Sequence, residues 1–169
     1  MGAWIAAYDG AGMADTPPGH ARTVAERAAV ILSSPLPRAL ASARLVAGDR
    51  PVAIMPDARE AAMPFARWTA PKLPPAVWTT LFRLGWFCGW HPRVESARDA
   101  RARAERVADR LIRRADAGAS VLLVGHGIAN RLIASAIRKR GWAGVAASPS
   151  GYWQWREYGW KGGGGLRLP

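Results

Sequence analysis

The fold is decided by residues 120–127, which read SVLLVGHG. The apolar run from Ser120 to Val124 is continuous rather than alternating, which is typical of a parallel strand buried on both faces. The glycines on either side of His126 let the backbone turn sharply and approach a ligand closely. Residues from Ile128 to about Arg140 have a helical pattern. The stretch therefore predicts a strand, a turn carrying a histidine, and a helix.

A second unit of the same form lies earlier in the chain. An apolar strand is expected over Val30–Leu32, followed by residues 33–38, SSPLPR, and by a helix from about Leu36 to Ala47. Ser34 is a candidate cap for this helix, with Pro35 at its first position. Because strands alternate with helices, the sequence predicts an α/β fold, a three-layer sandwich with one mostly parallel sheet and helices on both faces.

The remaining expected elements are weaker in pattern. In chain order they are a helix over Met1–Gly12, a helical run from Ala21, a strand over Pro51–Met55, an irregular segment over Ala58–Pro75, helices over Ala76–Phe87 and Val94–Ala117, and an edge strand over Tyr152–Tyr158. We expect one domain over residues 1–160 and a flexible glycine-rich tail over residues 161–169.

The basic composition raises the question of a nucleic-acid partner, because the net charge is +12. Of the 24 basic residues, 21 are arginine and three are lysine, and they form no block of five or six like charges. Abundant arginine, alanine and proline also result from a GC-rich genome without a functional demand. We therefore disfavour a nucleic-acid surface, and a small anionic substrate explains the charge equally well.

The single cysteine, Cys88, excludes an internal disulfide and suggests a reducing, cytoplasmic location. The longest apolar candidate, Val77–Trp90, is too short for a membrane span and contains Arg83. No secretory leader is visible at the N-terminus. We expect no membrane association.

The two strand-to-helix turns are the expected site, because ligands of such sheets bind outside the carboxyl ends of the strands. Arg38 would bind a phosphate through its guanidinium group, and His126 would hydrogen-bond a phosphoryl oxygen next to free helix amides. The alternatives are a surface arginine and a histidine packed at a tight turn. No histidine, cysteine or acidic residue accompanies His126 at metal-ligand spacing, so we expect no metal and no cofactor.

Two motifs together resemble the histidine phosphatase superfamily, which is phosphoglycerate-mutase-like. Residues 33–39, SSPLPRA, resemble the motif whose arginine grips the transferred phosphate, and residues 121–127, VLLVGHG, resemble the strand and turn that carry the second pocket histidine. The resemblance runs from about Trp4 to Tyr158. It implies phosphomonoester hydrolysis or phosphoryl transfer through a phosphohistidine, with a small phosphorylated substrate or a phosphate anion as the partner.

The resemblance also assigns individual residues. Arg38, His126 and Gly127 match phosphate-binding positions, and Glu60 matches the general acid for the leaving group. The alternative for Glu60 is a solvated loop glutamate. Glu95-Ser96 is similar to a pocket-edge element of some relatives, but we favour a simple helix start there.

The chain departs from the family because it contains no Arg-His-Gly, the end of the first strand that carries the nucleophilic histidine. Neither His20 nor His91 follows an apolar strand. We expect a sheet that lacks its first strand, with two unpaired strand edges, a truncated start, and little turnover as the chain stands. The alternatives are a non-catalytic pseudophosphatase that binds a phosphorylated ligand and, less favoured, a basic nucleic-acid-binding protein.

Overall fold

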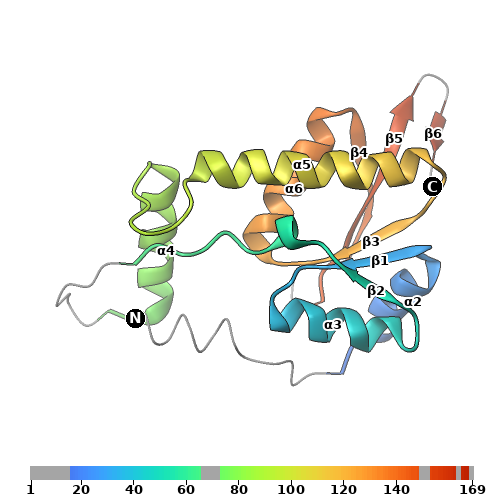
Figure 1. The fold of residues 1–169 in the computed structure, drawn as a ribbon, viewed down its shortest axis with the longest axis horizontal. Helices are drawn as coiled ribbons and strands as arrows, with labels where there is room; N and C mark the ends of the chain where they lie inside the picture. The colour runs from blue at the N-terminus through green and yellow to red at the C-terminus, as the bar shows by residue number, and fades with distance from the viewer. Residues whose placement is uncertain (1–15, 66–72, 149–152, 163–164, 168–169) are drawn as a thin grey trace.

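The computed structural model describes residues 16–65, 73–148, 153–162 and 165–167 (Figure 1). Its first sheet has the strand order β2-β1-β3, with β1 at Val30–Ser33, β2 at Val52–Ile54 and β3 at Val121–Val124. Both pairings are parallel, and β1 is in register with β3 along its whole length. The expected parallel α/β sheet is confirmed, with strand ends within one residue of the expected ones.

Helices cover both faces of this sheet (Figure 1). Helices α2 (Gly19–Arg27) and α3 (Pro37–Ala47) lie on one face, and α5 (Ala97–Asp116) and α6 (Gly127–Lys139) on the other. Leu32 and Leu123 pack toward α5 and α6, whereas their neighbours Ile31 and Leu122 pack toward α2 and α3. Because successive strand residues point to opposite faces, a continuous apolar run fills both cores.

The last part of the chain forms a second, antiparallel sheet of order β4-β5-β6. Its strands are β4 (Trp142–Ala147), β5 (Arg156–Gly162) and β6 (Gly165–Arg167). The expected edge strand at Tyr152–Tyr158 is therefore wrong in both bounds and position, because β5 is the central strand. Its neighbour β4, WAGVAA, is poor in β-branched and aromatic residues and gave no strand signal. Strand β5 crosses the boundary expected at residue 160, and β6 lies in the expected tail.

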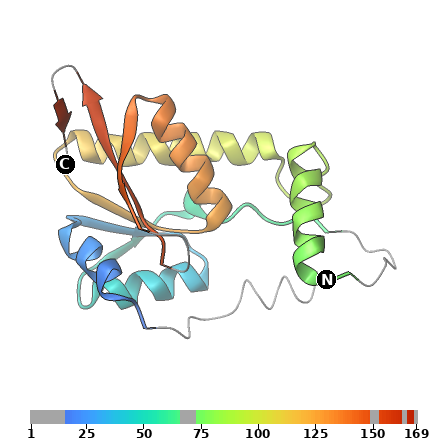
Figure 2. The same ribbon diagram turned by 180° about the vertical axis from the view of Figure 1, so that it is seen from behind.

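No strand of one sheet is hydrogen-bonded to a strand of the other among the described residues. Within the part of the chain that the structure describes, β3 pairs only with β1 and β4 only with β5. Each therefore has one edge without a strand partner among the described residues. Helix α6 packs against β4 (Figure 2) and also contributes Ile133 and Ile137 to the core above the parallel sheet, so it links the two sheets.

Helix α4 (Pro75–Phe87) lies apart from both sheets, at one end of the molecule (Figures 1 and 2). It is anchored by Trp86, which is fully buried in a cluster with alanines of α5 and of the preceding segment. Its other side exposes apolar residues, Val77, Leu81, Leu84 and Phe87. None of the helices in the described ranges is both long and apolar enough to span a membrane.

The start of the long helix differs from expectation. Helix α5 begins at Ala97 instead of Val94, because the Ser96 side chain accepts a hydrogen bond from the Asp99 amide at 3.1 Å and caps the helix. The favoured interpretation of Ser96 as a helix start is thus confirmed. The helix expected over Met1–Gly12 lies outside the described residues.

Candidate active site

The two strand-to-helix turns meet at one edge of the parallel sheet. The Ser34 amide donates to the carbonyl oxygen of Val124 at 2.9 Å, which continues the β1–β3 pairing into the turns. Beyond it, Ser34 Oγ is hydrogen-bonded to His126 Nε2, also at 2.9 Å. Ser34 is completely buried, so this bond fixes the imidazole against the end of β1.

Ser34 does not cap α3, contrary to expectation. The helix begins at Pro37, and Leu36 is its N-cap residue, without a side-chain bond to the helix amides. Ser34 Oγ instead accepts a 3.3 Å hydrogen bond from the Leu36 amide in addition to its bond with His126. The proline that starts the helix is Pro37, which needs no amide hydrogen at that position.

Arg38 is the second residue of α3 and is half-buried. Helix α3 begins at the sheet edge where β1 ends, and Arg38 follows Ser34 by four residues. Its carbonyl oxygen accepts the hydroxyl hydrogen of Ser42 at 2.8 Å, which is an ordinary bond within the helix. Arg38 and His126 therefore lie at helix starts that follow β1 and β3, which are neighbouring parallel strands of one sheet.

The two glycines beside His126 differ in their surroundings. A Cβ atom at Gly125 would lie 2.5 Å from Asn130 Oδ1, so a larger residue there would require the exposed Asn130 side chain to move. A Cβ atom at Gly127 would meet nothing within 4 Å. Gly127 is the first residue of α6, with His126 as the N-cap residue in an extended conformation.

Glu60 lies at the start of α6 and is not a solvated loop residue. Its Oε1 accepts from the amides of Ala61 at 2.9 Å and Ala129 at 2.8 Å, and its Oε2 accepts from the Ile128 amide at 3.2 Å. The sequence predicted free amides at this helix start, and there the prediction is wrong: a carboxylate of the same chain occupies them. A negative charge at this position is favourable because the amides and the helix dipole are positive there.

Two arginines hold the backbone on either side of Glu60. From α5, Arg103 donates to the carbonyl oxygens of Asp57 at 2.6 Å and Arg59 at 2.7 Å. From α4, Arg83 donates through both terminal nitrogens to the carbonyl oxygen of Ala61, each at 3.2 Å. The carbonyls just before and just after Glu60 are thus both bound by guanidinium groups from other helices.

Each of these arginines has its own support. Arg103 is only 4 % exposed and forms an ion pair with Glu95, which also bonds the guanidinium of Arg59 at 3.4 Å. Arg83 lies over the Trp86 ring at 5.1 Å. Burial lowers the pKa of Arg83, and the charge of Glu60 opposes that shift.

The sequence reasoning missed Arg83 and Arg103. Arg103 could have been found, because it lies among Ala100, Ala104 and Val107 on the apolar stripe of α5, where an arginine without partners would be costly. Arg83 had no comparable signal, since its acceptor is a backbone carbonyl in an irregular segment.

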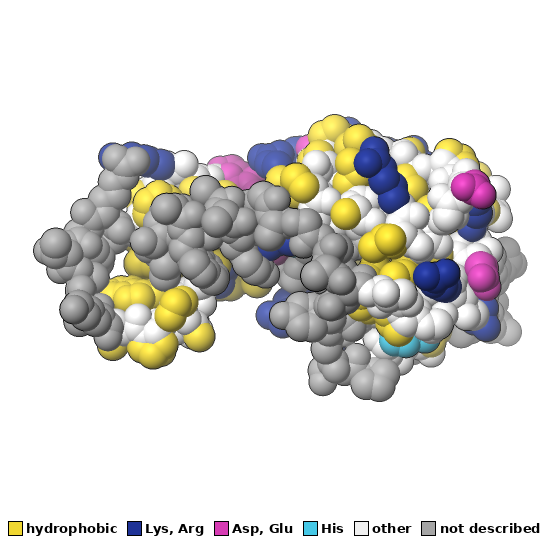
Figure 3. Space-filling view, turned by 90° about the horizontal axis from the view of Figure 1, so that it is seen from below, with side chains coloured by type: hydrophobic (Ala, Val, Ile, Leu, Met, Phe, Trp, Pro, Cys, Tyr) yellow, Lys and Arg dark blue, Asp and Glu magenta, His cyan; other side chains and the backbone are white. Residues whose placement is uncertain are grey.

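The other histidines lie elsewhere. His20 is exposed in the first turn of α2, with Nε2 3.4 Å from the carbonyl oxygen of Trp153, and His91 is exposed in the turn after α4. Within the described ranges, no three histidine, cysteine or acidic side chains lie close enough to hold a metal ion. Basic side chains on the face shown in Figure 3 are scattered among apolar and acidic ones rather than gathered in one patch.

A family model of the histidine phosphatase superfamily (branch 1) matches residues 19–166. Three similar solved structures are an Escherichia coli protein provisionally assigned as an alpha-ribazole-5'-P phosphatase (25 % identity, TM-score 0.49), a phosphoserine phosphatase of Entamoeba histolytica (20 %, 0.49) and a mycobacterial glucosyl-3-phosphoglycerate phosphatase (24 %, 0.47). The matches cover 68 %, 71 % and 70 % of this chain but only 61 %, 64 % and 64 % of those chains. No curated protein matches.

Proposed function

The chain belongs to the histidine phosphatase superfamily, and we propose that it binds the phosphoryl group of a small phosphate monoester at the ends of β1 and β3. In this proposal Arg38 binds phosphoryl oxygens through its guanidinium group, and His126 and the Gly127 backbone complete the pocket. Glu60 supplies a proton to the leaving oxygen. The complete reaction is phosphomonoester hydrolysis or phosphoryl transfer through a phosphohistidine.

The observation that most directly supports the proposal is the location of Glu60. Its carboxylate is bonded to the amides of Ile128 and Ala129, which follow His126 in the same helix start. A carboxylate and an imidazole from distant parts of the sequence therefore lie at one sheet edge, where the helix carrying Arg38 also begins. Phosphoryl transfer needs such a set: cations for the oxygens and a proton donor for the leaving group.

The geometry also favours one carboxylate oxygen for the proton. Glu60 Oε1 accepts two short hydrogen bonds from amides, whereas Oε2 accepts one bond of 3.2 Å. Oε2 therefore keeps more free acceptor capacity. We assign the proton transfer to Oε2 and the anchoring of the side chain to Oε1.

The covalent step needs a nucleophilic histidine in addition to these residues, and the sequence contains no Arg-His-Gly to supply one. A second candidate function is a non-catalytic module that binds a phosphorylated ligand at the same residues. The two candidates share the phosphate site and differ only in turnover.

The phosphate site is tested by calorimetric titration with inorganic phosphate and with vanadate. Arg38→Ala should weaken binding about tenfold or more, because a charged hydrogen-bond donor to an anion is lost. The matched control is Arg44→Ala, an exposed arginine of the same helix, which removes the same charge. Equal affinity in the wild type and Arg38→Ala would disprove the assignment.

A further inference from the structure

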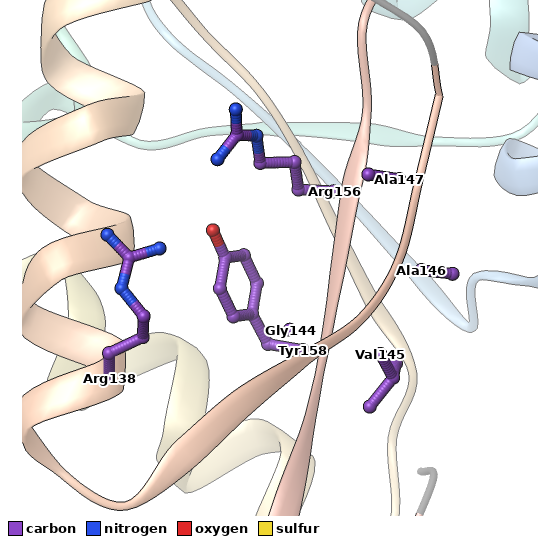
Figure 4. Close-up of a pocket in the computed structure, with 7 residues that line it drawn as sticks. All are labelled: Arg138, Gly144, Val145, Ala146, Ala147, Arg156 and Tyr158. Carbon is purple, nitrogen blue, oxygen red and sulfur yellow. The ribbon is translucent and has the colours of Figure 1, made fainter.

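A cavity of about 310 Å³ lies between the C-terminal end of α6 and the antiparallel sheet (Figure 4). It is lined by Arg138 of α6, residues 144–147 of β4, and Arg156 and Tyr158 of β5. Since a water molecule in the liquid occupies about 30 Å³, the cavity has room for roughly ten waters or one small organic molecule. It lies at the opposite end of α6 from His126.

The backbone of β4 helps to form this cavity. Gly144 is the register partner of Tyr158, and a Cβ atom there would meet only the carbonyl oxygen of Glu157, at 4.0 Å. The β4–β5 register shifts between Gly144 and Ala146, which leaves Val145 as an extra residue in β4. A glycine opposite a large ring, next to a bulge, leaves space that a regular strand would fill.

The charges around the cavity are unbalanced. Arg138 and Lys139 end α6, and Arg140 is its C-cap residue. Two of these three basic residues pair with α5: Lys139 with Glu105 at 4.0 Å and Arg140 with Asp109 at 2.6 Å. Among the described residues Arg138 has no acidic partner, and neither has Arg156. None of the described residues that line the cavity is an aspartate or a glutamate.

The third polar group is the hydroxyl of Tyr158. Its oxygen is buried and has no hydrogen-bond partner among the described residues. Arg156 and Tyr158 lie two residues apart in β5 and share one face of the sheet. Figure 4 shows the phenol hydroxyl directed toward the space between the two guanidinium groups. A buried hydroxyl without a partner is rare, and it calls for an acceptor that the described residues do not provide.

We propose that this cavity binds the phosphoryl group of a small phosphate monoester. The guanidinium groups of Arg138 and Arg156 bind phosphoryl oxygens, and the Tyr158 hydroxyl donates to a third oxygen. A dianion with three terminal oxygens matches two cations and one neutral donor. The volume beyond the phosphoryl group accommodates the organic part, so the monoester binds more tightly than inorganic phosphate. The proposal is independent of the site at Arg38 and His126.

The test is a titration of the ¹⁵N-labelled chain with glycerol 2-phosphate and, separately, with inorganic phosphate. The amides of Gly144 and Ala146 report this cavity, and those of Ile128 and Ala129 report the other end of α6. Glycerol 2-phosphate should shift the β4 amides in wild type and in Arg38→Ala alike. It should bind several-fold more tightly than inorganic phosphate.

Three variants sharpen the test. Tyr158→Phe should weaken binding about tenfold, while the free protein stays at least as stable as wild type because the hydroxyl has no partner. Gly144→Val should block binding by filling the space without any change of charge. Arg138→Ala should weaken binding about tenfold, whereas Arg131→Ala, an exposed arginine of the same helix, should change it less than about twofold.

Several outcomes would overturn the proposal. Unshifted β4 amides would exclude a ligand in the cavity. Equal losses in Arg138→Ala and Arg131→Ala, with Tyr158→Phe unchanged, would show an adventitious ion held by net charge only. If inorganic phosphate binds as tightly as the monoester, the cavity is a site for free phosphate and the monoester proposal is wrong.

Discussion

The two ends of α6 have opposite arrangements of charge. At the start, the amides of Ile128 and Ala129 donate to the Glu60 carboxylate. Two arginines bind the backbone carbonyls on either side of Glu60. At the end, Arg138 borders a cavity without an acidic partner among the described residues. The first end is completed by groups of the chain itself. At the second, Lys139 and Arg140 pair with acids of α5, and Arg138 is left without such a partner among the described residues. One helix thus carries a preorganised polar network at one end and a cavity suited to an anion at the other.

The largest expected effect concerns catalysis at the first end. The chain as given should hydrolyse an aryl phosphate only at background rate, because the site proposed at Arg38, His126 and Glu60 includes no residue assigned to form the covalent intermediate. Adding a relative's first strand, ending in Arg-His-Gly, to the N-terminus should raise turnover by several orders of magnitude. The measurements are steady-state hydrolysis and detection of an acid-labile phosphohistidine.

The control for this extension is the same protein with the added histidine changed to alanine. The strand alone should sharpen thermal unfolding, because it can pair with the edges of β3 and β4 that have no strand partner among the described residues. Robust turnover by the unextended chain, lost in His126→Ala, would contradict our view of the chemistry. An extended protein that folds no better and forms no phosphohistidine would favour the non-catalytic candidate.

The largest expected effect on stability comes from Arg103. Arg103→Met removes the buried partner of Glu95 and two hydrogen bonds to the carbonyls of Asp57 and Arg59, and should lower the free energy of unfolding by about 3–5 kcal/mol. Arg106→Ala, in the same helix, breaks only a surface pair with Asp57 at 3.7 Å and should cost less than about 1 kcal/mol. Urea unfolding compares the two, and similar losses would refute a special role for Arg103.

A smaller effect is expected at Glu60 itself. Glu60→Gln keeps the shape but removes the negative charge at the start of α6, which should cost about 1 kcal/mol. Glu60→Ala also removes the acceptor atoms and should cost about 2 kcal/mol. The ¹⁵N–¹H resonances of Ile128 and Ala129 should move in both variants. Unchanged resonances would show that the carboxylate does not occupy these amides in solution.

Much of the fold around the first end could be predicted from the sequence. The continuous apolar run of β3 and the helical pattern after Gly127 are local signals, and they placed His126 at the turn correctly. The same applies to β1 and to the helix that carries Arg38. The family resemblance then indicated Glu60, which composition alone could not distinguish from a solvated loop residue.

The rest depends on contacts between distant segments. Ser34 has the local features of a helix cap, but its hydroxyl is engaged by His126, 92 residues away. Arg83 binds a backbone carbonyl, which has no signature in the sequence, and Arg103 is marked only as a charged residue within the apolar stripe of α5. The cavity arises from a glycine opposite Tyr158 and a register shift, and strand pairing of this kind is invisible until β4 and β5 are aligned.

The smallest expected effect is a pH dependence at the second end of α6. The hydrogen bond from Arg140 lowers the pKa of Asp109 below its ordinary value of 3.8, and the charges of Arg140 and Arg113 act in the same direction. A carboxyl with a lowered pKa in the folded state stabilises the fold above the unfolded value and loses that contribution as the pH falls through the lowered one. Both side chains are partly exposed, so the contribution should stay below about 1 kcal/mol and decrease with added salt.

Asp109→Asn should therefore flatten the fall in stability below pH 3.8, whereas Glu105→Gln, which breaks the longer pair with Lys139, should leave it almost unchanged. Thermal unfolding across this pH range makes the comparison, and an unaltered pH profile in Asp109→Asn would show that the Arg140 pair contributes nothing to this end of the helix.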